Sequence, residues 1–460
     1  MSDVRDFGAS GDGKTDDFDA IQHAVNEGDG WVEFPPGDYL LNKPIVVDLT
    51  KRRRIGIAGS GGGAKILMAG SGPAFHLVGN HGGTADPETF KPAVWQQQRM
   101  PTIQNIEIEG RHAEADGIEL TGTMQAIISR VAIRGARNGV RLTKRNRNPI
   151  ISDCQIYHNR GGGIYLDGVN LHQINIIGNH ISYNRLGGIR IERSEVRNLQ
   201  ITGNDIEYNT DRTHKLGDQP TAEIYVDTTA PGATVNEIAI TSNTIQASPS
   251  PDGANIRIIE SDQHKDRPPG LWTIVGNVIG SQTNNVHLTR CYGVVISGNT
   301  IYSCRKYNLL IEHCRQVSVG SNIMRRHTTA AAAGMRLVDS VDCVLSGCQI
   351  LDEAAEGQTT GVSLLEIVRC RRINVTGCSI SNPSPFGILA ADSHDLNISG
   401  CTILESRRPS RMTSAIRMEG KGTGNLISGC RVGRGREQAL SFSKEAEATL
   451  AANVIDGPGD

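Results

Sequence analysis

The sequence predicts an all-β fold, a single right-handed parallel β-helix of about 12–14 coils with an N-terminal capping helix. The main observation is a short phrase that recurs eleven times: an apolar residue, any residue, a small residue, Asn or Cys, any residue and an apolar residue. The Asn or Cys positions lie 22 to 39 residues apart, near the length of one coil. They are Cys154, Asn179, Asn204, Asn243, Asn277, Asn299, Asn322, Cys348, Cys378, Cys401 and Cys430, with a weaker twelfth at Asn453.

The residue choice at these positions follows from stacking. Coils stacked about 4.8 Å apart align equivalent residues into ladders along the axis. An Asn tolerates left-handed backbone and bonds to neighbouring rungs, whereas a Cys fills the same small space. Cys291, Cys314 and Cys370 each lie eight residues before the Asn or Cys of their own coil and define a second ladder. Eight of the ten cysteines fall on these two ladders and are therefore expected to be reduced packing residues.

Composition agrees with one long repeat domain. The chain of 460 residues has 53 Gly but only seven Phe and three Trp, which suits a narrow interior of Ile, Val and Leu with many turns. We expect an N-terminal cap over residues 1–40, made of a short strand, a loop and a helix, and a β-helix over 41–460. A net charge of -2 and the lack of a long apolar run argue against nucleic-acid and membrane partners.

The first residues bear on location. The opening MSDVRDFGAS has no signal-peptide pattern, so a cytoplasmic location is expected, unless a signal was trimmed from a secreted protein.

The segment Gly8 to Thr15 matches G-x-x-x-x-G-K-[ST], the loop that cradles phosphates in nucleotide-binding proteins. Only a short polar strand, Val4 to Phe7, is expected before it, and no alternation of strands and helices follows. We therefore expect no nucleotide binding. Thr15 or Asp16 is expected to cap a short helix that closes the end of the solenoid.

The stretch from Val4 to Tyr39, which reads VRDFGASGDGKTDDFDAIQHAV and then VEFPPGDY, resembles the start of the pectate-lyase-like superfamily of right-handed parallel β-helices. The stretch PPGDYLLNKPIVVDLTKRRRIGIAG is also similar to the opening of inulin fructotransferases. The first resemblance implies a carbohydrate substrate and, as one option, a homo-oligomeric state, a trimer.

One strand of each coil carries outward polar side chains, because alternate residues of a strand face opposite sides. One expected outward column reads Glu119, Arg141, Tyr165, Arg190, Tyr225, Arg257, His287, Leu310 and Arg336. Two residues further along, a second column reads Thr121, Thr143, Asp167, Glu192, Asp227, Ile259, Thr289 and Glu312.

Insertions indicate which part of these columns is used. Extra residues at Asn209 to Pro220 and at Ser261 to Trp272 lie beside the same strands, and Asn80 to Pro101 could form a wall nearer the N-terminus. Long loops on a regular scaffold commonly carry function. His214 and His264, on two of these insertions, are expected to be solvated.

The predicted site is a saccharide groove between the insertions. Glu192 and Asp227 are the expected general acid and nucleophile or base, with Asp167 as a third catalytic carboxylate. The expected substrate-binding residues are Tyr165, Arg190, Glu223, Tyr225, Arg257 and His287. The alternative for each residue is that alternating Arg and Glu only stabilise an exposed sheet.

Three functions remain open from the sequence. The first is cleavage of glycosidic bonds by hydrolysis or intramolecular transfer, using paired carboxylates. The second is a lyase, in which Arg190 or Arg257 neutralises a uronate while Tyr225 or His287 takes the C5 proton. The third is a non-catalytic, glycan-binding or spike-like β-helix.

No cofactor is expected, because neither H-E-x-x-H nor paired C-x-x-C motifs occur. Calcium held by Asp167, Glu192 and Asp227 is the alternative, since it favours clustered oxygen ligands.

Overall fold

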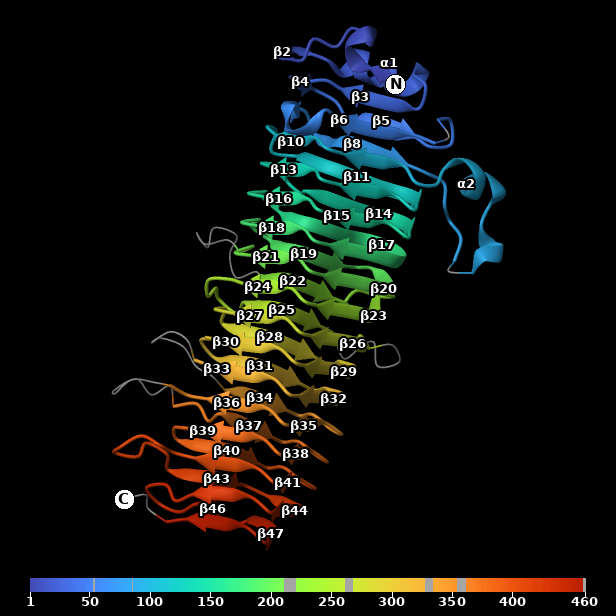
Figure 1. Cartoon of the computed structure of the whole chain (residues 1–460). Coiled ribbons are helices and arrows are strands. Elements are labelled where there is room, and N and C mark those ends of the chain that lie inside the picture. The colour runs from blue at the N-terminus through green and yellow to red at the C-terminus, as the bar shows by residue number, and fades with distance from the viewer. Residues whose placement is uncertain are drawn as a thin grey trace. The chain divides into compact units, whose positions relative to one another are not determined.

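The computed structural model describes residues 1–52, 54–84, 86–210, 221–260, 268–326, 334–353 and 361–457. The chain divides into two compact units, the first ending at Ala239 and the second beginning at Ile240. In each unit the strands form three parallel stacks, in which each strand pairs with its equivalent one coil later (Figure 1). This arrangement confirms the predicted all-β, parallel β-helix fold class.

The first stack carries the predicted outward columns. In the first unit it contains β5 (Ile45–Asp48), β8 (Gly72–Val78), β11 (Ala115–Met124), β14 (Val140–Arg147), β17 (Gly162–Ile177), β19 (Gly187–Glu192) and β22 (Ala222–Asp227). In the second unit it contains β25 (Ala254–Ile259), β28 (Asn284–Thr289), β31 (Tyr307–Glu312), β34 (Met335–Val338), β37 (Leu365–Val368), β40 (Phe386–Ala391), β43 (Ser414–Glu419) and β46 (Leu440–Phe442).

The second stack follows the first along each coil. In the first unit it contains β1 (Ser2–Asp3), β3 (Trp31–Phe34), β6 (Gly56–Gly59), β9 (Thr102–Gln104), β12 (Ile127–Ser129), β15 (Ile150–Ser152), the end of β17, β20 (Glu195–Thr202) and β23 (Thr234–Thr241). In the second unit it contains β26 (Gly270–Val275), β29 (Tyr292–Ser297), β32 (Arg315–Gly320), β35 (Val344–Ser346), β38 (Asn374–Thr376), β41 (Asn397–Ser399), β44 (Gly422–Ser428) and β47 (Ala446–Ala451).

The third stack closes each coil. In the first unit it contains β2 (Asp12–Asp16), β4 (Gly37–Leu41), β7 (Ala64–Met68), β10 (Glu107–Gly110), β13 (Ala132–Arg134), β16 (Gln155–Tyr157), β18 (His180–Ser182) and β21 (Asp205–Glu207). In the second unit it contains β24 (Thr244–Gln246), β27 (Val278–Gly280), β30 (Thr300–Tyr302), β33 (Ile323–Arg325), β36 (Gln349–Leu351), β39 (Ser379–Ser381), β42 (Thr402–Leu404), β45 (Arg431–Gly433) and β48 (Val454–Asp456).

The described residues contain few helical segments. They are the α-helices α1 (Phe18–Glu27) and α2 (Pro92–Gln97) and the 3-10 turns η1 (Val4–Phe7), η2 (Gly61–Gly63) and η3 (Pro87–Thr89). Val4 to Phe7 is thus a 3-10 turn and not the predicted strand. In the described ranges, no helix is long and apolar enough to cross a membrane.

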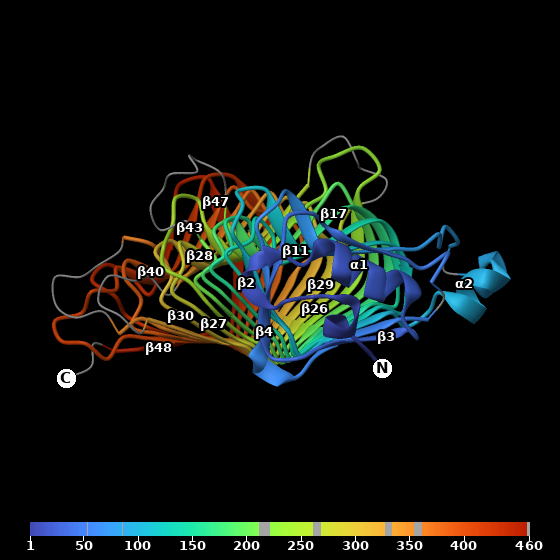
Figure 2. The same cartoon turned by 90° about the horizontal axis from the view of Figure 1, so that it is seen from above.

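Helix α1 covers the N-terminal end of the first unit (Figures 1 and 2). Its side chain Gln22 donates to the carbonyl oxygen of Val46 on β5 and accepts from the Val46 amide, at 3.0 and 2.9 Å. The helix therefore satisfies backbone groups that the first strands would otherwise leave unpaired. The N-cap residue is Asp17, one position after Asp16 and two after Thr15, the two predicted caps.

The repeated phrase forms the predicted ladder, with one change in its geometry. The left-handed residue is the small residue before the Asn, as at Gly178 (φ 67°) and Gly203 (φ 66°), and not the Asn itself. Asn204 accepts from both the backbone and the side-chain amide of Asn179, at 2.9 and 3.0 Å. The small residue thus makes the turn, and the Asn links the rungs.

The cysteines occupy the interior. All ten are free and buried. Burial raises the pKa of the Cys154 thiol to about 11, so it stays protonated at neutral pH. These side chains pack as small apolar groups, as the ladder positions predicted.

Candidate active site

The loop that matches the phosphate-binding motif uses its amides internally. Asp17 accepts from the backbone amides of Ser10 and Gly11, at 2.6 and 3.1 Å. Asp12 accepts from the backbone amides of Lys14 and Thr15, each at 2.8 Å. These donors are the groups that a phosphate would need, and two carboxylates already occupy them.

Lys14→Ala is therefore expected to change neither stability nor nucleotide affinity, because the wild-type loop should have no nucleotide affinity to lose. Calorimetry with ATP and GTP at millimolar concentration, with and without magnesium, checks this. Magnesium-dependent binding that Lys14→Ala removes would contradict it.

The predicted columns are in register. In the first unit, Tyr165 lies opposite Arg141 and Arg190, and Glu192 lies opposite Asp167 and Asp227. In the second unit, Arg257 lies opposite His287. The columns are less exposed than expected, since Arg190 and Tyr225 are only 8% and 5% accessible. Long side chains lie flat along the stack and cover their neighbours, so an outward position becomes buried.

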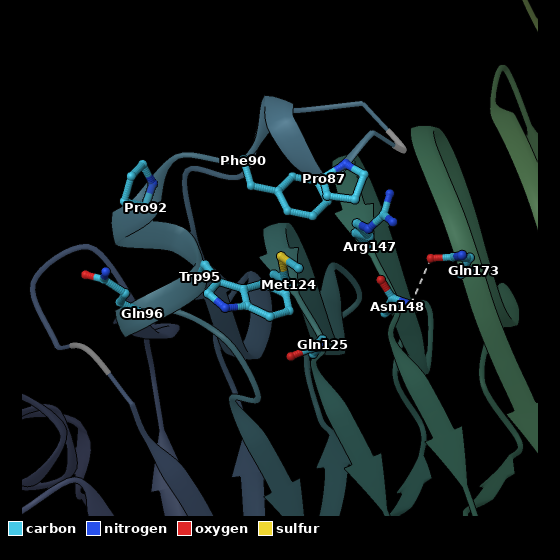
Figure 3. Close-up of a pocket in the computed structure, with 10 residues that line it drawn as sticks. All are labelled: Pro87, Phe90, Pro92, Trp95, Gln96, Met124, Gln125, Arg147, Asn148 and Gln173. Atoms are coloured by element: carbon cyan, nitrogen blue, oxygen red, sulfur yellow. Dashed lines mark hydrogen bonds between the residues drawn. The ribbon is translucent and has the colours of Figure 1, made fainter.

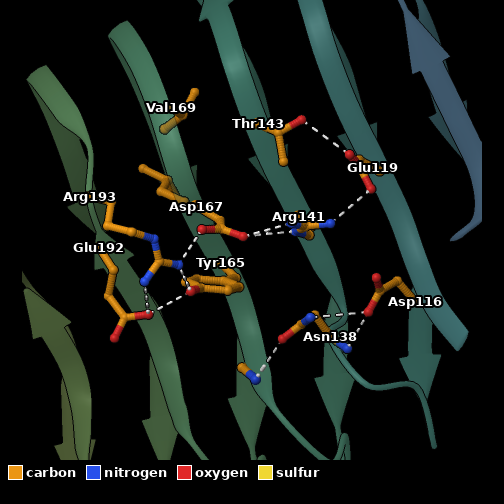
Figure 4. Close-up of polar contacts among 12 residues, drawn as sticks. Asp116, Glu119, Asn138, Arg141, Thr143, Tyr165, Asp167, Val169, Glu192 and Arg193 are labelled. Carbon is orange, nitrogen blue, oxygen red and sulfur yellow. Dashed lines mark hydrogen bonds and ion pairs between the residues drawn. The ribbon is translucent and has the colours of Figure 1, made fainter. Parts of the chain in front are cut away.

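Tyr165 and Glu192 form the centre of a polar cluster in the first unit (Figure 4). The Tyr165 hydroxyl donates to Glu192 Oε2 and accepts from Arg193 Nη2, both at 2.6 Å. Glu192 Oε1 pairs with Arg190 Nη2 at 2.5 Å. Burial, and then the hydrogen bond to Glu192, raise the pKa of Tyr165, so its phenol keeps its proton at neutral pH.

Two arginines hold Asp167. Arg141 Nη2 lies 2.7 Å from its Oδ2, and Arg193 bonds to its Oδ1. Burial acts to raise the pKa of Asp167, but the bonds from Arg141 and Arg193 outweigh it and leave the pKa below its usual value. Asp167 is therefore a poor proton donor and a good anchor for both arginines.

Asp227 has a different environment. Its carboxylate accepts from the Thr229 backbone amide and hydroxyl at 2.9 and 2.6 Å, and from the Tyr225 hydroxyl at 3.4 Å. Among the described residues, no arginine or lysine pairs with it. The Tyr225 ring lies beneath Arg190, with the guanidinium 4.3 Å from the ring centre.

Glu223 does not face the predicted groove. It is fully buried and accepts from the backbone and side-chain amides of Asn209, at 2.9 and 2.5 Å. There it extends a second internal ladder, formed by Asn159, Asn184 and Asn209. The predicted position of Glu223 in the groove is therefore wrong, because the side chain points into the coil.

The two predicted residues of the second unit are also engaged. Arg257 Nη2 pairs with Asp252 at 2.9 Å, and His287 Nε2 lies 2.7 Å from Glu312 Oε2. Hydrogen bonding to His287 holds the pKa of Glu312 below its usual value.

A separate cluster in the second unit contains Tyr307, Arg336 and Glu366. Arg336 Nη1 lies 3.0 Å from the Tyr307 hydroxyl and 3.1 Å from Glu366.

Two of the three carboxylates named for the calcium alternative already pair with arginine side chains. In the described part of the chain, no three His, Cys, Asp or Glu side chains are grouped to hold a metal ion. Arg190 and Tyr165 engage Glu192, and arginines engage Asp167. His214 and His264, with most of their insertions, lie outside the described residues.

Arg193 is the residue that sequence reasoning missed. It follows β19 at a left-handed turn (φ 53°) and bonds back to Tyr165 and Asp167 on the preceding rung. Its side chain is 54% exposed, so its guanidinium combines contact with the cluster and access to solvent. The only sequence signal was an arginine next to the strand, which strand alternation does not place.

Fold and register define a right-handed parallel β-helix protein. The family described as "Right handed beta helix region" matches residues 93–230 and 355–460, more than half of the chain, and the protein belongs to this family. Residues 1–101 match the family "Rhamnogalacturonase A/epimerase, pectate lyase-like". The predicted membership in the pectate-lyase-like superfamily is thereby confirmed.

Individual relatives are more distant. Mannuronan C5-epimerase AlgE6 of Azotobacter vinelandii is 39% identical over 83 residues, which cover 16% of this chain and 10% of that relative. The Pseudomonas phage phi297 tailspike gp61 is similar in structure, with a TM-score of 0.51, 13% identity and coverage of 93% and 79% of the two chains. The A-module of AlgE6 has a TM-score of 0.42 and 17% identity over both whole chains. The tailspike likeness supports the fold alone.

Proposed function

We propose that the protein is a carbohydrate-active enzyme that removes the C5 proton of a uronate in a polysaccharide, as a lyase or an epimerase. The observation that carries this proposal is the Tyr165 hydroxyl, bracketed by Glu192 and Arg193. The similarity to a protein named mannuronan C5-epimerase supports an acidic sugar as substrate.

Each part of the cluster has a task in this chemistry. Arg193, partly exposed, pairs with the uronate carboxylate and stabilises the negative charge that develops when the C5 proton leaves. Asp227, which lacks a cationic partner in the described residues, is the base that accepts this proton. Tyr165 holds a proton because its pKa is raised, and it donates that proton.

Two outcomes follow from where the Tyr165 proton goes. In a lyase, the C5 electron pair forms the C4–C5 double bond, the C4–O bond breaks and the leaving oxygen takes the proton. In an epimerase, C5 itself takes the proton on the opposite face. These roles replace those of Arg190 or Arg257 and of Tyr225 or His287 in the sequence-based lyase hypothesis, since all four side chains are almost fully buried.

Cleavage by paired carboxylates is the second candidate, and one observation favours it. Glu192 and Asp227 lie on adjacent rungs. Adjacent rungs are about 4.8 Å apart, close to the carboxyl separation of about 5–5.5 Å in retaining glycosidases.

Product analysis tests the proposal. Purified protein is incubated with polymannuronate, polygalacturonate and neutral glucans. We expect ultraviolet-absorbing unsaturated ends, or a changed ratio of uronate epimers by NMR, on an acidic chain only. Reducing ends without ultraviolet absorbance would favour the carboxylate mechanism, and binding without any product would favour a non-catalytic β-helix.

A further inference from the structure

The first unit also contains a groove whose lining residues include none of those in the Tyr165 cluster. One part is a cavity of about 530 Å³ (Figure 3). It lies between residues 87–97, called the α2 segment because they end with helix α2, and the ends of β11 and β14. A second cavity of about 600 Å³ continues from it along β12, β15 and β20. Both are lined by Gln125, Asn148 and Gln173, so they form one continuous groove.

Amide side chains form the floor of this groove. Gln125, Asn148, Gln173 and Asn198 occupy equivalent left-handed positions on successive coils. Within the described residues, the side chain of Gln125 bonds to no protein group, whereas Asn148 donates to Gln173 at 2.9 Å. Rungs about 4.8 Å apart repeat at nearly the length of one sugar residue, so the amides can bond to hydroxyls of successive sugars.

Aromatic rings form one wall. Phe90 and Trp95 stack with ring centres 6.3 Å apart and planes 14° apart, and both line the cavity. Trp95 is 45% exposed. An exposed indole beside clustered amides is typical of a surface that stacks against a sugar ring.

Arg147 adds an unmatched positive charge. It is only 7% exposed, yet no carboxylate lies within 4.0 Å of it among the described residues. Its contacts are the Thr84 carbonyl at 3.2 Å and the Phe90 ring at 4.7 Å. The residues on the adjacent rungs are Met124 and His172, neither of them acidic. A buried guanidinium without a counter-ion favours a ligand that brings a carboxylate.

We propose that this groove binds a stretch of a uronic-acid chain without transforming it. Trp95 stacks on a sugar ring, Arg147 pairs with a carboxylate, and the amide floor bonds to hydroxyls. The proposal rests on the groove's own residues and goes beyond the reaction proposed at Tyr165. Such a surface would hold a long acidic chain on the protein between reactions.

Calorimetry on the full chain tests the groove, with a short oligomannuronate and a neutral manno-oligosaccharide of equal length. Wild type should bind the acidic chain more tightly. Arg147→Gln should lose about tenfold in affinity for the acidic chain and little for the neutral one. Trp95→Ala should weaken both several-fold, because stacking does not depend on charge.

Arg160→Gln is the matched control. Arg160 also lies in the first unit, contacts the carbonyls of His112 and Ala113, and has no carboxylate partner among the described residues. It is outside the groove, so its variant should bind as wild type. Arg147→Lys keeps the charge but not the planar fork, so it should retain part of the affinity for the acidic chain. This variant tests the proposal even if Arg147→Gln folds poorly.

Equal binding of acidic and neutral chains, or wild-type binding by both Arg147→Gln and Trp95→Ala, would overturn the proposal. Its failure is distinguishable from failure of the proposed reaction. Uronate turnover with an inactive groove leaves the reaction standing, whereas groove binding without any product leaves the groove standing.

Discussion

Tyr165→Phe should lower the turnover of a uronate polysaccharide by about 100-fold or more, the usual loss when a proton-transfer group is removed. The fold should survive, because the variant loses only the bonds of one hydroxyl to Glu192 and Arg193, about 1–2 kcal/mol. Initial rates on the active substrate, with thermal unfolding measured on the same preparations, check both parts.

Tyr307→Phe is the matched control. Tyr307 lies in the same kind of cluster, with Arg336 and Glu366, but in the second unit. The Tyr307→Phe and Arg336→Ala variants should both retain most activity. If Tyr307→Phe abolishes turnover while Tyr165→Phe does not, the reaction belongs to the second unit.

The carboxylates separate the two candidate mechanisms further. In the C5 mechanism, Asp227→Asn removes the base and should cost about 100-fold or more, whereas Glu192→Gln keeps an acceptor for the Tyr165 hydroxyl and should cost less. In the glycosidase mechanism, both variants should be equally damaging. The ratio of the two losses therefore identifies the mechanism independently of the product.

Glu223→Ala should destabilise the protein by about 2–4 kcal/mol, because it leaves two buried donors of Asn209 without an acceptor. Glu223→Gln keeps one acceptor oxygen and should cost less. Denaturant unfolding measures the free energy, and sugar binding by the folded variant measures the other role. Wild-type stability with lost sugar binding would restore the ligand role that the sequence suggested.

The sequence determined the repeat and the register of the columns. Ladder residues must recur once per coil and strand residues alternate, so the Asn or Cys phrase and the apolar alternation placed Tyr165, Arg190 and Glu192 correctly relative to one another. Their catalytic roles stay predictions. Because the repeat leaves no alternation of strands and helices after Gly8 to Thr15, the sequence also indicated that this motif is not a nucleotide-binding loop.

Only the tertiary structure decided which polar side chains point into the coil and which lie on its surface. Glu223 is near the start of β22, and its side chain turns into the coil. Arg193 follows the last residue of β19, and its side chain turns back over the preceding rung. Near strand boundaries, turn geometry and not alternation sets the direction of a side chain. The groove at Trp95 and Arg147 brings together residues from the α2 segment and from three later coils. Local periodicity determines what repeats within a coil, whereas contacts between an irregular insertion and distant coils depend on the folded path of the chain.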